Sequence, residues 1–192
     1  MSTMKKLILM IMLAMPVLAM AQKTDDKPYL SGAVPEENGL VVFTKTFDTS
    51  DKSQAEVFSA LMTAVKQLMS EGRQDLRTRL VSDTDNTIVA RVEETMTFKK
   101  KFLNWDHTYF RYIIAAEALA DHKAKVTIRN ISYYYGFDQE GNNGEEYKAE
   151  EWISDKTAIN KAGTKLYPRS GKFRRKTVDR VEEIFQAIGQ KL

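Results

Sequence analysis

The sequence predicts an α+β fold, in which a five-stranded antiparallel sheet carries two main helices on one of its faces. Three observations predict this architecture. The segments follow the order strand, helix, four strands, helix. Both long helical segments carry an apolar stripe, which one shared sheet face would bury. The links between the last four strands are short and polar, as is typical of antiparallel neighbours.

The first strand and helix have the clearest signals. Residues 40–47 are rich in β-branched and aromatic residues, which favours a strand. Ser53 and Glu56 then have the spacing of a capping box, in which each side chain binds a free backbone N–H of the other residue. Apolar residues recur at helical spacing after this point, and Gly72 is expected to end the helix.

Four strands are expected next, separated by short polar breaks. Their approximate ranges are 76–82, 87–98, 107–119 and 125–135. The second of these strands alternates regularly. It is expected to place Ile88, Ala90, Val92, Met96 and Phe98 on one face, and Arg91, Glu93, Thr95 and Thr97 on the other.

The last third of the chain begins with an irregular stretch at residues 136–147. A short helix is expected over residues 149–160, with Trp152, Ile153 and Ile159 facing inward. A final amphipathic helix is expected after Pro168, with Ser170 as its N-cap.

The N-terminus has the three parts of an export signal. Lys5 and Lys6 precede an apolar run at residues 7–19, and Ala19-Met20-Ala21 has the pattern of a cleavage site. The run is shorter than the ~20 residues that a helix needs to cross a bilayer. We therefore expect a cleaved signal peptide at residues 1–21, no transmembrane anchor after cleavage, and a location in the periplasm of a Gram-negative bacterium. An uncleaved anchor is the less favoured alternative.

After the signal peptide, we expect a flexible lead-in at residues 22–38, with a docked segment around residues 29–34, and one α+β domain at residues 39–192. Without residues 1–21, the chain has 27 basic and 26 acidic side chains, so its charge gives no general affinity for nucleic acid. The sequence contains no cysteine, which excludes disulfides and thiolate chemistry.

Several segments resemble a known family. They are Pro28-Tyr29-Leu30, the strand at residues 40–47, the segment 149–156 and, most specifically, the segment 170–179. Together they make the chain similar to exported bacterial proteins of unknown function whose domain is described as having a TATA-binding-protein-like fold. This resemblance implies the same fold and an exported protein. It implies no activity and no site.

The fold name does not imply DNA binding for this chain. TATA-binding proteins bind the minor groove with basic residues and apolar wedges. The open sheet face here would carry charges of both signs, for which cross-strand ion pairing is the simpler explanation. The charged residues expected on this face are Arg91, Glu93, Arg111, Glu117 and Arg129.

The start of the final helix holds the candidate site. Lys172 and Arg174 lie in its first turns, and a helix N-terminus is a common anion site. With Trp152, these residues are our candidate ligand-binding set. The alternative, which we favour, is that Arg174 is a buried anchor paired with Glu150 or Glu151. Arg175 is expected to face outward and pair with Asp179.

The sequence contains no convincing catalytic, metal or cofactor motif. The two histidines, His107 and His122, flank one predicted strand and lie too far apart to share a metal ion. Glu93 and Glu94 would point to opposite faces of a strand, so they cannot act as a carboxylate pair. The phosphate-loop and calcium-loop patterns each fail at required positions.

These observations favour a non-catalytic binding module with no cofactor. Its open sheet face would bind a partner protein or a small amphipathic ligand. The alternatives are a carrier of such a ligand and an enzyme of unrecognised type with an anion pocket near the start of the last helix. A cleft with strongly shifted titrating groups near Trp152, Lys172 and Arg174 would favour the enzyme, and closed ion pairs there would oppose it.

Overall fold

The computed structural model describes residues 25–49, 51–72, 77–84, 86–102, 104–137 and 143–192. The predicted signal peptide lies outside these residues. In chain order the elements are the 3₁₀ helix Lys27–Tyr29, β1 (Glu36–Glu37), β2 (Leu40–Val41), β3 (Phe43–Asp48), α2 (Gln54–Glu71), β4 (Arg79–Thr84), β5 (Thr87–Lys101), β6 (Asn104–Leu119), β7 (Lys123–Tyr135), β8 (Glu145–Lys148), α3 (Ala149–Trp152), α4 (Asp155–Ala158) and α5 (Pro168–Gly189).

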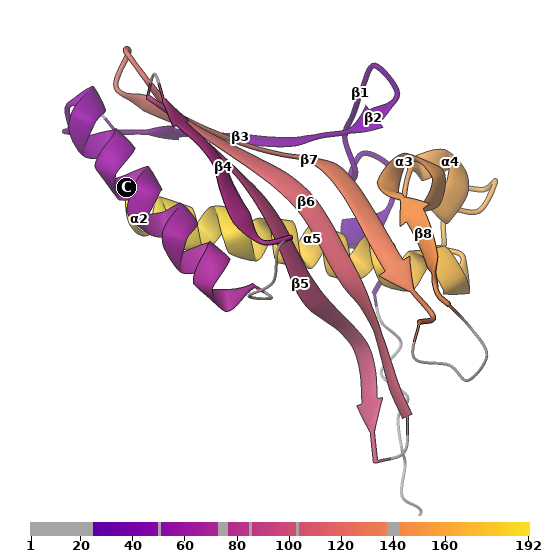
Figure 1. The fold of residues 1–192 in the computed structure, drawn as a ribbon. Coiled ribbons are helices and arrows are strands. Elements are labelled where there is room, and N and C mark those ends of the chain that lie inside the picture. The colour runs from indigo at the N-terminus through magenta and orange to yellow at the C-terminus, as the bar shows by residue number, and fades with distance from the viewer. Residues whose placement is uncertain (1–24, 50, 73–76, 85, 103, 138–142) are drawn as a thin grey trace, which may run out of the picture.

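One antiparallel sheet forms the centre of the molecule (Figure 1). Its strands lie in the order β3-β7-β6-β5-β4, and β8 pairs with the part of β7 that β3 does not reach. Each of the five predicted strands has a counterpart, but the predicted strand at residues 40–47 is divided: only β3 joins this sheet, and β2 lies outside it. The sixth strand, β8, was not predicted and lies at the end of the stretch that we expected to be irregular. Its four residues, EEYK, show no apolar alternation that would indicate a strand. The pairing of β2 with the two-residue strand β1 was not predicted.

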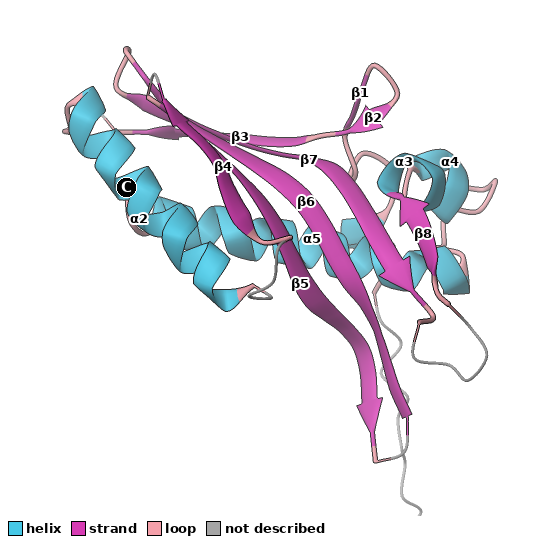
Figure 2. Cartoon of the chain, viewed as in Figure 1, coloured by secondary structure: helices cyan, strands magenta, loops and turns pink. Residues whose placement is uncertain are grey.

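The two long helices, α2 and α5, pack on the same face of the sheet, as predicted (Figure 2). Ile88, Ala90 and Val92 of β5 are completely buried beneath them. The core also contains Leu61 of α2 and Phe173 of α5. The alternation of side chains along β5 therefore separates a buried face from an open one.

Helix α2 has the predicted ends. The Ser53 and Glu56 side chains form the complete capping box, and Gly72 is the C-cap. Helix α5 begins earlier than expected, with Tyr167 as N-cap and Pro168 in the first turn. Ser170 is therefore not the cap: it is buried inside the helix, where its hydroxyl donates a hydrogen bond to the Thr157 carbonyl (3.3 Å). Proline has no N–H, so it suits the first helical position.

The predicted helix at residues 149–160 is two short helices, α3 and α4. They are separated at Ile153 and Ser154, where the extended backbone of Ser154 interrupts the helix. Ile153 is completely buried, so the segment packs inward as expected. Among the described residues, no helix is long and apolar enough to cross a lipid bilayer.

Strands β5 and β6 extend beyond the rest of the sheet as a two-stranded ribbon (Figure 1). The pairing of β6 with β7 ends at Thr108, whereas its pairing with β5 continues to Asn104 opposite Lys101. The base of this ribbon lies against the first turns of α5.

Candidate functional site on the open face of the sheet

The open face carries its side chains in rows that run across neighbouring strands. One row consists of Arg79 of β4, Arg91 of β5, Ile113 of β6 and Arg129 of β7, each directly opposite the next. All three arginines are exposed. None of them forms an ion pair with any residue that the structure describes. We call Arg79, Arg91 and Arg129 the arginine row.

A β-bulge in β7 brings additional polar groups to this row. Between the pairs Arg111–Ser132 and Ile113–Arg129, β7 has one residue more than β6. Asn130 takes up the extra length in the left-handed conformation, with φ +53°, which asparagine adopts more readily than most residues. As a result, the adjacent residues Arg129 and Asn130 are both exposed, while Ile131 returns to the core.

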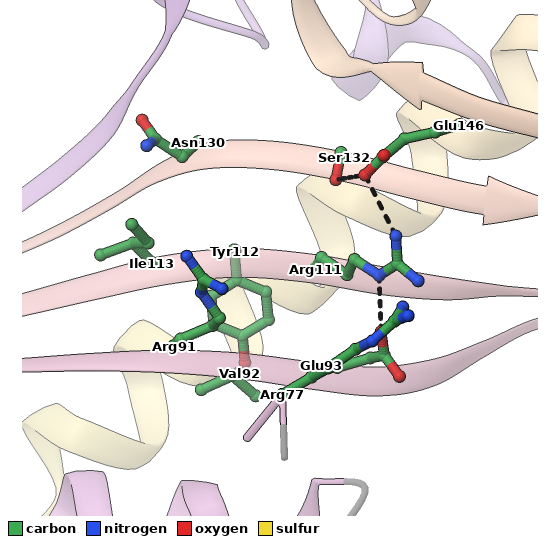
Figure 3. A pocket seen from close by; sticks show the side chains of 10 residues that line it. All are labelled: Arg77, Arg91, Val92, Glu93, Arg111, Tyr112, Ile113, Asn130, Ser132 and Glu146. Carbon is green, nitrogen blue, oxygen red and sulfur yellow. Dashed lines mark hydrogen bonds and ion pairs between the residues drawn. The ribbon is translucent and has the colours of Figure 1, made fainter. Parts of the chain in front are cut away.

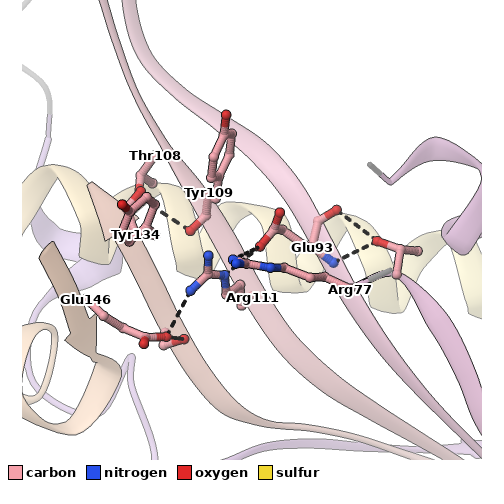
Figure 4. Close-up of polar contacts among 9 residues, drawn as sticks. Arg77, Glu93, Thr108, Tyr109, Arg111, Tyr134 and Glu146 are labelled. Atoms are coloured by element: carbon pink, nitrogen blue, oxygen red, sulfur yellow. Dashed lines mark hydrogen bonds and ion pairs between the residues drawn. The ribbon is translucent and has the colours of Figure 1, made fainter. Parts of the chain in front are cut away.

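The next row is a chain of ion pairs (Figures 3 and 4). The Arg111 guanidinium lies between Glu93 Oε2 (2.5 Å) and Glu146 Oε1 (3.1 Å). Arg77 approaches the same Glu93 oxygen at 3.1 Å, and the Ser132 hydroxyl donates to Glu146. The Glu93 side chain is only 2 % exposed, so the pairing compensates for the burial of its charge.

An aromatic cluster lies on the other side of this ion-pair chain. The Phe137 ring stacks on Tyr109 (centroids 4.2 Å apart) and lies parallel to Tyr134 (5.4 Å). The Arg111 guanidinium lies over the Tyr134 ring at 5.1 Å. We call Tyr109, Tyr134 and Phe137 the aromatic cluster.

A cavity of about 320 Å³ opens between the arginine row and the ion-pair chain. It is lined by the residues in Figure 3, namely Arg77, Arg91, Val92, Glu93, Arg111, Tyr112, Ile113, Asn130, Ser132 and Glu146. A second cavity, of about 540 Å³, shares Asn130, Ser132 and Glu146 with the first and extends to the exposed Leu40. The open face therefore has a polar hollow next to apolar and aromatic surface.

The candidate residue Arg174 is completely buried and bound by the protein itself. Its guanidinium donates to the carbonyls of Tyr29 (2.5 Å), Leu30 (2.8 Å) and Ile153 (2.6 Å). It also pairs with Asp155 Oδ1 at 2.6 Å. It is the buried anchor that we favoured, but the expected partner was wrong.

The carboxylates near Arg174 have separate contacts. Burial alone would raise the pKa of Asp155, but hydrogen bonds from Ser31, Arg174 and the Gly32 amide outweigh this effect and lower it. Glu150, which we expected to be a possible partner of Arg174, instead accepts a hydrogen bond from the Val41 amide (3.0 Å). The carboxylate partner of Arg174 thus comes from the short helix α4, which the sequence pattern did not separate from α3.

The other two candidates, Lys172 and Trp152, both lie close to the Phe173 ring. The Lys172 ammonium contacts both Asp106 oxygens (2.9 and 2.7 Å) and the Tyr135 hydroxyl (2.9 Å). Trp152 stacks on Tyr147 and has a buried indole nitrogen without a hydrogen-bond partner in the described structure. Lys172 and Arg174 point into separate ion pairs. A ligand shared by the three residues stays a prediction.

Other sequence-based expectations had mixed outcomes. Glu93 lies on the open face, whereas Glu94 pairs with Arg180 of α5, so the two carboxylates do point apart. Arg175 pairs with Asp26 and not with Asp179, because the N-terminal segment packs along this part of α5. The described residues include no group of three His, Cys, Asp or Glu side chains placed to hold a metal ion.

Cross-strand ion pairing accounts for only part of the open face. It holds for Arg111 with Glu93 and for Glu117 with Lys125 (3.4 Å). It fails for Arg91 and Arg129, which lie in the row with Arg79. Strand register and the bulge at Asn130 decide which charges face each other, and neither could be read from the sequence.

Comparisons with known proteins identify the family. A model described as a domain of unknown function (DUF4468) with TBP-like fold matches residues 43–134. The crystal structure of a DUF4468 family protein from Bacteroides ovatus is 35% identical, covers 88% of this chain and 95% of that chain, and has a TM-score of 0.79. This chain belongs to the DUF4468 family. The resemblance seen in the sequence and its TBP-like α+β fold are thereby confirmed.

A more distant structure shows the same DUF4468-type fold. The TBP-like protein from Parabacteroides distasonis is 20% identical, with a TM-score of 0.65, and covers 83% of this chain and 96% of that chain. No curated protein matches the chain. The DUF4468 match includes the arginine row and Arg111, whereas Trp152, Lys172 and Arg174 lie beyond it.

Proposed function

We propose that this DUF4468 protein is an exported, non-catalytic binding module whose open sheet face holds a small amphipathic anion. The arginine row is the observation that carries the proposal. Arg79 and Arg91 lie directly opposite each other, and like charges at opposite positions of a sheet are unfavourable. A bound anion would remove this repulsion.

Arginine suits such a ligand well. Its planar guanidinium can bind a carboxylate, sulfonate or phosphate through two parallel hydrogen bonds. Arg91 of β5 and the Asn130 amide of β7 both line the cavity. The Arg111 guanidinium is already paired with Glu93 and Glu146. It would therefore attract the anion by its charge but could move toward it less than the arginines of the row.

Apolar residues adjoin the arginine row on one side and lie beyond the ion-pair chain on the other. Val89 and Ala115 form the next row, and the aromatic cluster lies beyond the ion-pair chain. A ligand with an anionic group and an apolar body could therefore place each part on matching surface. This is why we favour an amphipathic anion over a simple inorganic one.

The region first considered for an enzyme supports a non-catalytic role. Lys172 and Arg174 are each engaged by protein groups at hydrogen-bond distance. In this region the lowered pKa of Asp155 is explained by its pairing and hydrogen bonds. These are the closed ion pairs that oppose the enzyme hypothesis.

The N-terminal sequence supports the proposal of export. Residues 1–21 combine two lysines, an apolar run and a small-residue cleavage pattern. Intact-mass measurement of the protein isolated from its own cell envelope should give a chain that begins at Gln22. A chain that retains residues 7–19 would overturn this part of the proposal.

The ligand proposal can be tested with a matched pair of fluorescent probes. 8-Anilinonaphthalene-1-sulfonate is an amphipathic anion, and N-phenyl-1-naphthylamine is its uncharged analogue. We expect the triple variant R79Q/R91Q/R129Q to bind the anionic probe at least about tenfold more weakly, because charge-assisted hydrogen bonds are lost. Binding of the neutral probe should change little.

The control variant is K66Q/K161Q/K165Q, which removes the same charge from exposed lysines away from the open face. It should bind both probes like the wild type. An equal loss of affinity for the anionic probe in both triple variants would mean that the probe responds only to the net charge of the protein, and this would contradict the proposal. Unchanged affinity in R79Q/R91Q/R129Q would overturn the proposal.

A further inference from the structure

We propose that the tip of the β5–β6 ribbon docks on an anionic lipid bilayer. The tip combines exposed aromatic side chains with a compact group of lysines, at the end of an element that projects from the sheet (Figure 1). The inference is separate from the open-face ligand, because it rests on other residues.

The apolar part of the tip is unusually exposed. Phe102, at the turn, is 99% exposed, and Trp105 is 45% exposed. Trp105 is held in place from two sides: its ring stacks on His107 with centroids 3.8 Å apart, and its indole nitrogen donates to Thr97 Oγ1 (3.1 Å). Tryptophan is enriched where proteins meet the interface between lipid and water.

The basic part directly precedes the turn. Lys99, Lys100 and Lys101 are all exposed, and none forms an ion pair with a residue that the structure describes. The sequence has no acidic residue between Glu94 and Asp106, and the Asp106 carboxylate is paired with Lys172. The tip therefore concentrates three positive charges, on a chain whose formal net charge is +3.

The ribbon is anchored firmly enough to present these groups. Phe98 is the extra residue of a β-bulge in β5, and its ring packs on Phe173 of α5 with the ring centroids 4.5 Å apart. Lys172 joins the same base to α5 through Asp106 and lies 4.6 Å from the Phe98 ring. These contacts give Lys172 a structural role at the base of the ribbon.

The lysines and the exposed aromatic side chains together favour an anionic bilayer as the partner that binds the tip. Clustered lysines are attracted to anionic lipid headgroups, and each contributes roughly fivefold to binding near the surface. Phe102 and Trp105 can insert between the headgroups at the same time. A nucleic acid would use the lysines but would leave Phe102 exposed at the turn.

Vesicle sedimentation tests the proposal. We expect the protein to bind vesicles of phosphatidylethanolamine and phosphatidylglycerol but not vesicles of phosphatidylcholine. High salt should release the bound protein. The variants F102S and K99Q/K100Q/K101Q should each lower binding at least about tenfold. The control K66Q/K161Q/K165Q and the variant R79Q/R91Q/R129Q should lower it much less. Circular dichroism should confirm that every variant is folded.

Fluorescence gives a second readout. Trp105 emission should shift to shorter wavelength on anionic vesicles, and W105F should abolish the shift while the other tryptophan remains. Equal binding by wild type, F102S and K99Q/K100Q/K101Q would overturn the proposal. So would a vesicle-free dimer, seen by sedimentation velocity, that F102S dissociates, because the tip would then bind a second copy of the chain.

Discussion

At the scale of single residues, Arg174 shows how one side chain joins three parts of the chain. Its guanidinium reaches the N-terminal segment at Tyr29 and Leu30, the end of α3 at Ile153, and Asp155 of α4. Removing one partner of a buried ion pair leaves an uncompensated charge and several unsatisfied carbonyls. The position is therefore intolerant of substitution because of the protein groups that the guanidinium binds.

We expect Arg174→Met to lower the free energy of unfolding by about 3–5 kcal/mol. The matched control is Arg175→Met, which breaks the partly exposed pair with Asp26 and should cost about 0–1 kcal/mol. Urea denaturation of both variants measures the difference. Equal losses would show that Arg174 is not the anchor described above.

At the scale of elements, local signals in the sequence predicted the segments with the strongest periodicity. The capping box and Gly72 fixed both ends of α2, and alternation fixed the two faces of β5. Segments shaped by distant contacts were missed. Strand β8 exists because the exposed part of β7 beyond β3 offers it backbone partners, and no local pattern shows this.

The α2 capping box gives a prediction at this scale. Ser53→Ala removes the hydroxyl that accepts from the Glu56 amide and should cost about 1 kcal/mol of unfolding free energy. Ser59→Ala, at an exposed position within the same helix, should change it by no more than a few tenths of a kcal/mol. A thermal or urea unfolding series would test this. A larger loss in Ser59→Ala would contradict it.

At the scale of the whole molecule, the helices and the arginine row occupy opposite sides of one sheet. The sequence predicted that division, because two amphipathic helices need a common apolar surface. It did not predict the arginine row. Arg79 becomes a neighbour of Arg91 only through the β4–β5 register, and Arg129 joins them through the bulge at Asn130. Pairing between strands is a property of the assembled sheet.

Stability should depend on pH through carboxylates that are paired in the folded state. Hydrogen bonds lower the pKa of Asp155 despite its burial, so the unfolded chain binds a proton more readily than the folded one. The stabilisation is complete above the ordinary carboxyl pKa of about 4 and is lost as the pH falls through the folded value.

Asp155→Asn provides the measurement. The wild type should be more stable than this variant at about pH 7, and the gap should be smaller at about pH 3, where protonation of the unfolded wild-type carboxyl already offsets part of the stabilisation. Urea denaturation at both pH values measures the gap. A gap that widens on acidification would contradict the assignment of Asp155 as an ionised partner of Arg174.

The central claim is that the open face, and not the start of α5, receives the ligand. Amide chemical-shift mapping during titration with 8-anilinonaphthalene-1-sulfonate tests it most directly. The account predicts the largest shifts at the amides of Arg91, Ile113 and Arg129. Shifts concentrated instead around Trp152 and Lys172, with the arginine row unaffected, would contradict it.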